Sequence, residues 1–349
     1  MQQDRAIANS SADVAPMLDD PLFVNQLDFT DLYISAEKGE VFLRGALEES
    51  SAPLTRIDPQ VVSDIDELRR KLLDHGARPG ADSFFFEYSG VRYRVTEITE
   101  MNGKWYTLRR FLDEIPRMNT LGLPLPTYQA LGKIARSGHG AIVFAGRTGE
   151  GKTTTAYSCL QEFLMQVGGP AMTIENPPEM KLSGKIGDFG HCFQVAVENG
   201  NFAAALKKAL RSTPRYILLG EILGGDEARE LLRASINGHV VITTIHAGSI
   251  EEALQSMLKL SVDATTNIEF ARETLSQGVA AVVYQRLKTA RGPDGKIYRT
   301  IEAETLFLGD DSSPVRARIR DGKLAQIKSD IEQQANRVAL NKSPIEKAR

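Results

Sequence analysis

The amino-acid sequence predicts an α/β protein in which a parallel sheet, covered by helices on both faces, follows a smaller α+β domain. Two observations predict this class. Short apolar runs at residues 141–145, 171–174, 216–219 and 240–244 alternate with helical segments, which is typical of a parallel sheet. Upstream, β-rich segments separated by Ser-Gly and Asn-Gly dipeptides indicate antiparallel strands joined by tight turns.

The first half of the chain predicts the α+β domain. Residues 31–35 and 40–44 flank a Glu-Lys-Gly turn and predict a β-hairpin. Residues 59–74 predict a helix, because their apolar side chains form one stripe and a glycine follows the last turn. Alternating apolar and polar side chains predict an antiparallel meander over residues 84–88, 91–98 and 104–110.

Changes of composition suggest where the domains begin and end. A segment with two prolines, a glycine and no helical stripe separates the two halves, so we expect a linker there. The first residues are polar and we expect them to be flexible. The expected organisation is a flexible N-terminus (1–21), an α+β domain (22–116), a linker (117–126), an α/β domain (127–308) and a C-terminal helical appendix or tail (309–349).

The composition narrows the class of protein. The 349 residues are 42% hydrophobic, which is enough for a packed core, and a net charge of −3 gives no broad nucleic-acid-binding footprint. The two cysteines, Cys159 and Cys192, predict neither a disulfide framework nor a four-cysteine zinc site, and fit a reducing compartment. We recognise no signal peptide and no run of about 18 apolar residues. We therefore expect a cytoplasmic protein that reaches a membrane only through protein partners.

Residues 146–153 read GRTGEGKT, a complete G-x-x-x-x-G-K-[ST] phosphate-binding loop between an apolar strand and a helical pattern. The glycines let backbone N–H groups turn toward phosphate oxygens, and the helix N-terminus adds partial positive charge. Lys152 is expected to reach the β- and γ-phosphates, and Thr153 to hold Mg²⁺. The alternative is a glycine turn before a helix. The predicted ATP-binding residues of this segment are Gly146, Thr148, Gly149, Glu150, Gly151, Lys152, Thr153 and Thr154.

Two acidic residues stand at the ends of predicted strands. Glu221 follows the run 216–219, and Glu175 follows the run 171–174. The carboxyl ends of parallel strands meet at the edge of the sheet where the phosphate loop begins. We predict that Glu221 polarises the attacking water and that Glu175 assists Mg²⁺ or water placement; with Thr153 they form the expected metal site. The alternatives are an ordinary strand-end acid for Glu221 and a solvated turn acid for Glu175.

Two histidines and one arginine are weaker candidates. His239 opens the run 240–244 and His246 closes it, so His246 is expected at the nucleotide edge, where it could sense the γ-phosphate. A zinc site is not indicated, because no third ligand has suitable spacing. Arg211 ends a predicted helix before the Glu221 strand and is a candidate for contact with phosphates or a neighbouring subunit. Plain structural histidines and a solvated basic helix face are the alternatives.

Taken in order, these motifs resemble those of the secretion-superfamily ATPases: type II secretion and type IV pilus motors, PilT-like retraction ATPases and DotB-like ATPases of type IVB secretion and conjugation. Residues 146–153 match the Walker A motif, and 174–179 resemble the acidic Asp box. Residues 211–221 resemble the Walker B segment, and His239 with His246 match the His box.

The resemblance extends to the first half of the chain. Residues 31–35 resemble the family's opening motif, with Tyr33 in place of a histidine. Arg94 and Arg109 fall where the family places N-domain arginines that contact the nucleotide when the two domains close. The resemblance therefore covers roughly residues 28–335.

The resemblance implies a RecA-like P-loop NTPase domain with a smaller N-terminal α+β (PAS-like) domain. It implies a homohexamer that hydrolyses ATP with Mg²⁺ and powers a type IV pilus or type IV (IVB or conjugative) secretion machine by domain motion. The implied partners are inner-membrane platform or secretion-complex proteins, with the motor peripheral to the inner membrane; nucleic acid is not expected.

The resemblance also implies roles for individual residues. Glu221, Glu175 and His246 take part in catalysis. Arg94 and Arg109 neutralise charge on the phosphoryl group. Two further residues of the implied nucleotide site are His239 and Arg211.

Several positions depart from the family pattern. Asn176 stands where the family has Asp, Thr213 replaces an acid, and Leu223 with Gly224 replaces an Arg-Asp pair. Each departure loses a charge near Glu221, so a catalytically weak nucleotide-binding scaffold is an alternative function. A RecA-fold nucleic-acid motor is a third, and the net negative charge counts against it. The lack of a four-cysteine zinc module favours the PilT-like or DotB-like branch.

Overall fold

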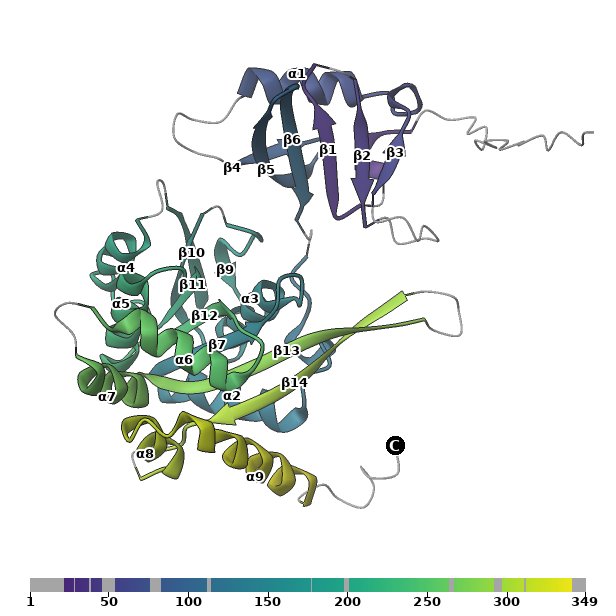
Figure 1. The fold of residues 1–349 in the computed structure, drawn as a ribbon. Coiled ribbons are helices and arrows are strands. Elements are labelled where there is room, and N and C mark those ends of the chain that lie inside the picture. Colours follow the sequence, from purple (N-terminus) through teal and green to yellow (C-terminus); the bar gives the residue numbers. More distant parts are fainter. Residues whose placement is uncertain are drawn as a thin grey trace, which may run out of the picture. The chain divides into compact units, whose positions relative to one another are not determined.

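The computed structural model describes residues 22–27, 29–37, 39–45, 54–75, 83–111, 114–176, 178–197, 201–263, 267–291, 297–310 and 312–340. The expected flexible N-terminus, residues 1–21, lies outside the described residues. The described residues form two compact units, each of which can be followed in Figure 1, and the main division along the chain falls between Arg110 and Phe111.

The first unit is a six-stranded sheet of order β3-β2-β1-β6-β5-β4, accompanied by helix α1. The predicted hairpin is present, since β1 pairs antiparallel with β2, and β5 pairs antiparallel with β6 as the meander predicted. The PAS-like assignment of this unit stays a prediction. Its elements are η1 (Val24–Gln26), β1 (Asp31–Ser35), β2 (Val41–Arg44), β3 (Thr55–Ile57), η2 (Pro59–Val61), α1 (Ile65–His75), β4 (Ser83–Tyr88), β5 (Val91–Glu100) and β6 (Gly103–Arg110).

The helix expected over residues 59–74 is in fact two elements. Pro59 opens the short 3-10 turn η2, which the Asp58 side chain caps by accepting a hydrogen bond from the Gln60 N–H group. The α-helix begins only at Ile65, and its buried stripe is Ile65, Leu68 and Leu72. Val61 lies outside the helix and is 47% exposed, so the stripe is one residue shorter than predicted.

The second unit contains an eight-stranded sheet of order β14-β13-β7-β12-β11-β8-β10-β9. Its six inner strands pair in parallel, and antiparallel partners close it at β9 and β14. The four predicted strands are β7, β8, β11 and β12. The strands are β7 (Gly140–Gly146), β8 (Gly169–Glu175), β9 (Gly184–Ile186), β10 (Gly190–Ala196), β11 (Tyr216–Glu221), β12 (Val240–His246), β13 (Val279–Arg291) and β14 (Ile297–Phe307).

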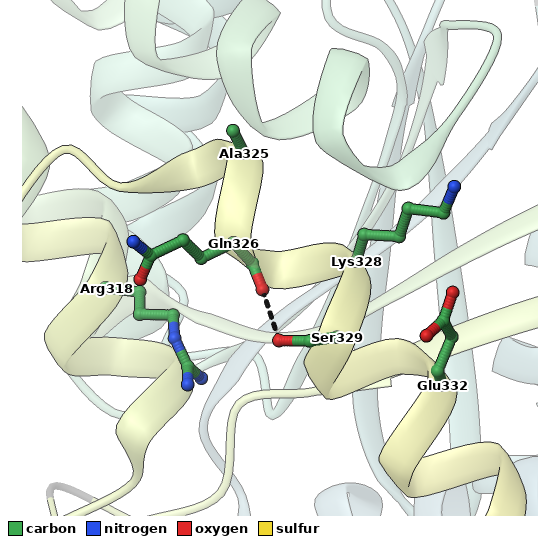
Figure 2. A pocket seen from close by; sticks show the side chains of 6 residues that line it. All are labelled: Arg318, Ala325, Gln326, Lys328, Ser329 and Glu332. Atoms are coloured by element: carbon green, nitrogen blue, oxygen red, sulfur yellow. Dashed lines mark hydrogen bonds between the residues drawn. The ribbon is translucent and has the colours of Figure 1, made fainter.

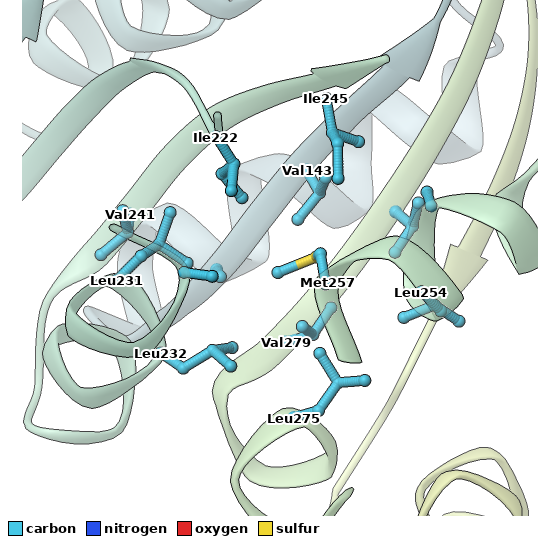
Figure 3. Close-up of a cluster of buried hydrophobic side chains, with 14 of the residues drawn as sticks. Val143, Ile222, Leu231, Leu232, Val241, Ile245, Leu254, Met257, Leu275 and Val279 are labelled. Carbon is cyan, nitrogen blue, oxygen red and sulfur yellow. The ribbon is translucent and has the colours of Figure 1, made fainter. Parts of the chain in front are cut away.

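Helices cover both faces of this sheet, which confirms the predicted α/β class. One buried cluster joins α2 and α3 to one face, and the other joins the helices from α4 to α8 to the opposite face. Figure 3 shows the second cluster, where Leu231 and Met257 pack toward Val143. The helices are η3 (Met118–Thr120), α2 (Leu125–Ser137), α3 (Lys152–Gln166), α4 (Phe202–Leu210), α5 (Gly225–Ile236), α6 (Ile250–Ser261), α7 (Ile268–Gly278), α8 (Pro314–Arg320), η4 (Leu324–Gln326) and α9 (Ile327–Leu340).

Two segments are more tightly packed than the sequence suggested. Residues 117–126, expected as a linker, belong to the second unit: Met118 is buried in its core, and the Ile301 N–H group donates to the Leu121 carbonyl. At the other end, the expected C-terminal appendix supplies Ile319 and Ile327 to the core cluster. The prolines of the first segment mark the start of α2, a position that proline tolerates well.

Candidate functional site

The phosphate-loop sequence forms a tight turn between strand β7 and helix α3. Strand β7 is buried along its whole length and ends at Gly146. Gly149 and Gly151 adopt φ angles of 83° and 74°, which glycine reaches without strain, and Gly151 is the N-cap of α3. Because Gly151 has no side chain to cap the helix, the first N–H groups of α3 stay available to an anion.

Strand β13 supports this loop from behind. The buried Gln285 side chain donates from Nε2 to the Glu150 carbonyl at 2.6 Å, and the Leu287 N–H group donates to the Glu150 carboxylate. A Cβ atom on Gly146 would lie 2.6 Å from the Gln285 carbonyl oxygen, so only glycine fits there. The Glu150 side chain, expected at the phosphates, is therefore used to hold the loop to β13.

Lys152 is the buried cation of the loop. Its Nζ donates to the Arg147 carbonyl at 3.0 Å and lies 3.3 Å from Nδ1 of His246. Burial lowers the pKa of Lys152, and the carboxylates of Glu221 and Glu150 oppose that effect. A buried ammonium group beside one loop carbonyl is suited to bind an anionic ligand. Such a ligand would replace the interactions with water that the ammonium group loses on burial.

His246 and Glu221 lie together beside the loop, as the strand-end argument predicted. Strand β12 pairs with β7 so that His246 is opposite Gly146, and β11 pairs with β12 on its other side. Nε2 of His246 lies 2.8 Å from Oε1 of Glu221, and Nδ1 lies 3.4 Å from the Thr148 hydroxyl. Both side chains remain partly exposed, at 48% for His246 and 30% for Glu221, although Oε1 of Glu221 itself is buried.

Glu175 ends the neighbouring strand β8, but its side chain is only 3% exposed. Both carboxylate oxygens accept from the Tyr157 hydroxyl, at 2.6 and 2.7 Å. Burial raises the pKa of Glu175 to about 7, while the hydrogen bond from Tyr157 acts in the opposite direction. The solvated-turn alternative for Glu175 is therefore wrong, and the residue that holds it, Tyr157, was not singled out from the sequence.

His239 and Arg211 do not join the loop within this chain. His239 precedes β12 and its Nδ1 lies 2.6 Å from the Pro214 carbonyl, at the amino ends of β11 and β12. Arg211 is the exposed C-cap of α4 and also precedes β11. A strand of seven residues separates the two edges of the sheet by about 20 Å. The expectation that they join the nucleotide site within this chain is therefore corrected, because strand direction puts them at the opposite edge, whereas contact of Arg211 with a neighbouring subunit stays a prediction.

The two arginines of the first unit lie in one row of its sheet. Arg94 on β5 is directly opposite Arg109 on β6, and Arg109 is opposite Asp31 on β1. Nε of Arg109 donates to Oδ1 of Asp31 at 2.8 Å. Asp31 is buried while the Arg109 side chain is 56% exposed, so a buried carboxylate holds a guanidinium group on the surface of the sheet.

The loop residues fit ATP and Mg²⁺. Gly149 has open space where a Cβ atom would be, so its backbone can be approached closely by a phosphate. Thr153 and Thr154 begin helix α3, where their N–H groups and hydroxyls are expected to serve phosphates and Mg²⁺. Within the described ranges, no group of three or more His, Cys, Asp or Glu residues is arranged to hold a metal by itself.

One hollow among the described residues lies away from the phosphate loop. Figure 2 shows a hollow over the C-terminal helices, lined by Arg318, Ala325, Gln326, Lys328, Ser329 and Glu332. There, the Ser329 hydroxyl donates to the Gln326 carbonyl at 2.7 Å. Among the helices of the described part of the chain, none is long and apolar enough to cross a membrane.

Comparison with known proteins finds similar sequences over most of the chain. The family model described as "Type II/IV secretion system protein" matches residues 78–330, which is more than half of the chain. The type II secretion system protein E of Pseudomonas aeruginosa is 28% identical over 272 residues, covering 76% of this chain and 52% of that protein. The chain thus spans about half the length of this curated relative.

Two solved structures have similar folds. The pilus retraction motor PilT with bound ADP matches with a TM-score of 0.68 and 24% identity, covering 88% of this chain and 87% of that chain. The Legionella pneumophila ATPase DotB matches with a TM-score of 0.66 and 22% identity, covering 90% and 85%. At these identities the likeness shows the fold, which is that of the RecA-like ATPases.

Proposed function

Because the chain belongs to the type II/IV secretion system protein family, we propose that it is a motor subunit that hydrolyses ATP and powers a type IV pilus or type IV secretion machine. One observation carries the proposal: Lys152, His246 and Glu221 converge beside the phosphate loop. Nζ of Lys152 lies 3.3 Å from Nδ1 of His246, and Nε2 of His246 lies 2.8 Å from Oε1 of Glu221. These are the charges and the base that phosphoryl transfer to water requires.

The residues of the loop divide the work between binding and hydrolysis. Lys152 and the N–H groups at the start of α3 bind the phosphates, and Thr153 supplies a hydroxyl to Mg²⁺. When bound, Mg²⁺ neutralises charge on the phosphate oxygens. Glu221 orients the attacking water and accepts its proton, and His246 fixes the orientation of the Glu221 carboxylate. Glu175, which is buried at the end of the neighbouring strand β8, assists the placement of Mg²⁺ or of the attacking water.

The remaining parts of the proposal concern the assembled machine. Arg94 and Arg109 supply positive charge to the phosphoryl group in the transition state. The working form is a homohexamer that acts in the cytoplasm at the inner membrane, through platform or secretion-complex proteins. The fold likeness to PilT and DotB supports a motor of the pilus or type IV kind, and the sequence likeness to a type II secretion protein keeps that machine as the alternative.

The proposal is tested by steady-state hydrolysis of Mg²⁺-ATP over a range of protein concentrations. Activity that rises more than linearly with concentration would support hydrolysis by an assembled ring. Lys152→Ala should abolish activity by removing the phosphate-binding cation, whereas Lys185→Ala, on the exposed edge strand β9, should leave it unchanged. Activity in Lys152→Ala equal to that of the wild type would overturn the proposal.

A second candidate function is a nucleotide-binding scaffold with little turnover. It is favoured by the charges missing at Asn176, Leu223 and Gly224, which follow the carboxyl ends of β8 and β11, whereas Thr213 precedes β11 and lies at the opposite edge of the sheet. Tight ATP binding without hydrolysis at any protein concentration would favour the scaffold. Salt-sensitive DNA binding with DNA-stimulated hydrolysis would instead favour a nucleic-acid motor.

A further inference from the structure

A buried hydrogen-bonded chain connects helix α3 with strand β8 and the segment that follows β8. The Tyr157 hydroxyl donates to both oxygens of Glu175, and the Gln194 side chain donates from Nε2 to the Tyr157 hydroxyl oxygen at 3.2 Å. Tyr157 is fully buried and Glu175 nearly so. Few groups in an apolar core are held by as many defined partners, and such networks fix side-chain positions.

Gln194 also ties the segment 180–183 to this chain. Its Oε1 accepts from the N–H groups of Leu182 and Ser183 at 2.7 and 2.9 Å, and its Nε2 donates to the Met180 carbonyl at 2.8 Å. Gln194, on β10, therefore orients Tyr157 and also holds segment 180–183, which follows Glu175 in the sequence. A movement of that segment would be transmitted to the tyrosine through a single side chain.

Tyr157 and Glu175 both lie close to residues that are assigned to hydrolysis. Tyr157 is one helical turn after Thr153, so the two side chains project from the same face of α3. On the next strand, a Cβ atom at Gly220 would lie 3.4 Å from Cγ of Glu175, so Glu175 packs against the residue before Glu221. A displaced Glu175 carboxylate would thus disturb the strand end that carries Glu221.

We propose that Tyr157 is a positioning residue, whose hydroxyl, oriented by Gln194, fixes the Glu175 carboxylate behind Glu221 and links segment 180–183 to the phosphate-loop helix. The inference rests on the proposed ATPase function and adds to it a residue that acts through Glu175. Tyr157 itself is separated from solvent and does not contact the reacting atoms. Its effect is therefore expected on the rate of the chemical step and not on nucleotide affinity.

The test is ATP hydrolysis by the wild type, Tyr157→Phe, Glu175→Gln and the double variant. Tyr157→Phe keeps the ring and removes only the hydroxyl, and should lower kcat about tenfold while KM for ATP changes less than about twofold. Tyr216→Phe is the matched control, since that buried tyrosine lies in the same core cluster and its hydroxyl interacts with the Ala135 carbonyl, at 3.4 Å, and with Arg215 rather than with Glu175. It should leave kcat unchanged.

The double variant separates a positioning role from a packing role. If Tyr157 acts through Glu175, the Phe substitution should cost nothing further in the Glu175→Gln background; equal costs in both backgrounds would overturn the inference. Wild-type kcat in Tyr157→Phe would overturn it too while leaving the proposed function in place. Absence of hydrolysis in the wild type would overturn both.

Discussion

Nε2 of His246 lies 2.8 Å from Oε1 of Glu221, across the neighbouring strands β12 and β11. The other ring nitrogen lies 3.3 Å from Nζ of Lys152, so one imidazole connects the phosphate-binding cation to the proposed base. A ligand that changes the position of Lys152 can therefore change the orientation of Glu221. We propose that His246 passes a movement of Lys152 on nucleotide binding to Glu221, the proposed base.

The first prediction concerns His246→Ala. We expect kcat to fall at least about tenfold, because Glu221 loses the group that orients it, while KM for ATP changes little. Steady-state kinetics measure both constants. His191→Ala is the control, because His191 is exposed on β10 and contacts Phe193. A matching fall in the control would mean that the effect is not specific to the site.

The second prediction compares two glycines of the loop. In Gly146→Ala the new Cβ atom would meet the Gln285 carbonyl oxygen at 2.6 Å, so the loop must shift and ATP binding should be lost. In Gly149→Ala the φ angle of 83° costs about 1–2 kcal/mol, but no atom lies within 4 Å of the new group. Calorimetric titration with ATP should find weaker binding for Gly146→Ala than for Gly149→Ala. The reverse order would contradict the described loop.

The third prediction concerns Gln285, which holds the loop from β13. Gln285→Ala removes the hydrogen bond to the Glu150 carbonyl in a buried place, which should destabilise the fold by about 1–3 kcal/mol and raise KM for ATP. Thermal unfolding measures the loss of stability, and steady-state kinetics measure KM. The exposed Gln277, on α7, supplies the control substitution Gln277→Ala. An unchanged KM for Gln285→Ala would show that β13 does not support the loop.

The fourth prediction follows from the pKa of Glu175, which burial raises to about 7 from an ordinary 4.5. A raised carboxyl pKa means that ionisation is less favourable in the folded state. Ionisation of Glu175 therefore lowers the free energy of unfolding progressively as pH rises from about 4.5 to 7. The full loss, reached above that range, is up to about 3 kcal/mol. Glu175→Gln should gain in melting temperature relative to the wild type between pH 5 and pH 8. A difference that stays constant with pH, as expected for the exposed Glu332→Gln, would contradict the burial argument.

The parallel core could be predicted from the sequence because each inner strand is a continuous apolar run. Strand β10 was not predicted, since His191 and Gln194 interrupt its apolar pattern; one is exposed and the other serves the buried network with Tyr157. Strand β13 was missed as a support of the loop, because a glutamine after an apolar run gives no sign of what it will contact. The sequence position of Met118 likewise could not show that the expected linker enters the core.

The site residues could likewise be predicted only where strand position determines them. Strand direction placed Glu221 and His246 correctly at the carboxyl edge, and the same rule, fully applied, would have placed His239 and Arg211 at the other edge. The hydrogen bonds of Glu175 depend on a tyrosine 18 residues earlier in the chain, and no local pattern predicts that contact. Sequence motifs therefore locate a site when their residues lie at the ends of neighbouring strands. The residues that support the site are determined by packing, which the motifs do not show.

The measurement that tests the account most directly is hydrolysis and binding of Mg²⁺-ATP by Glu221→Gln beside the exposed Glu269→Gln on α7. If Glu221 is the base, its amide variant should bind ATP with an affinity close to that of the wild type and lose at least about a hundredfold in kcat. Glu269→Gln should match the wild type in both. Hydrolysis by Glu221→Gln at the wild-type rate would contradict the assignment of the base and, with it, the role given to the Lys152–His246–Glu221 connection.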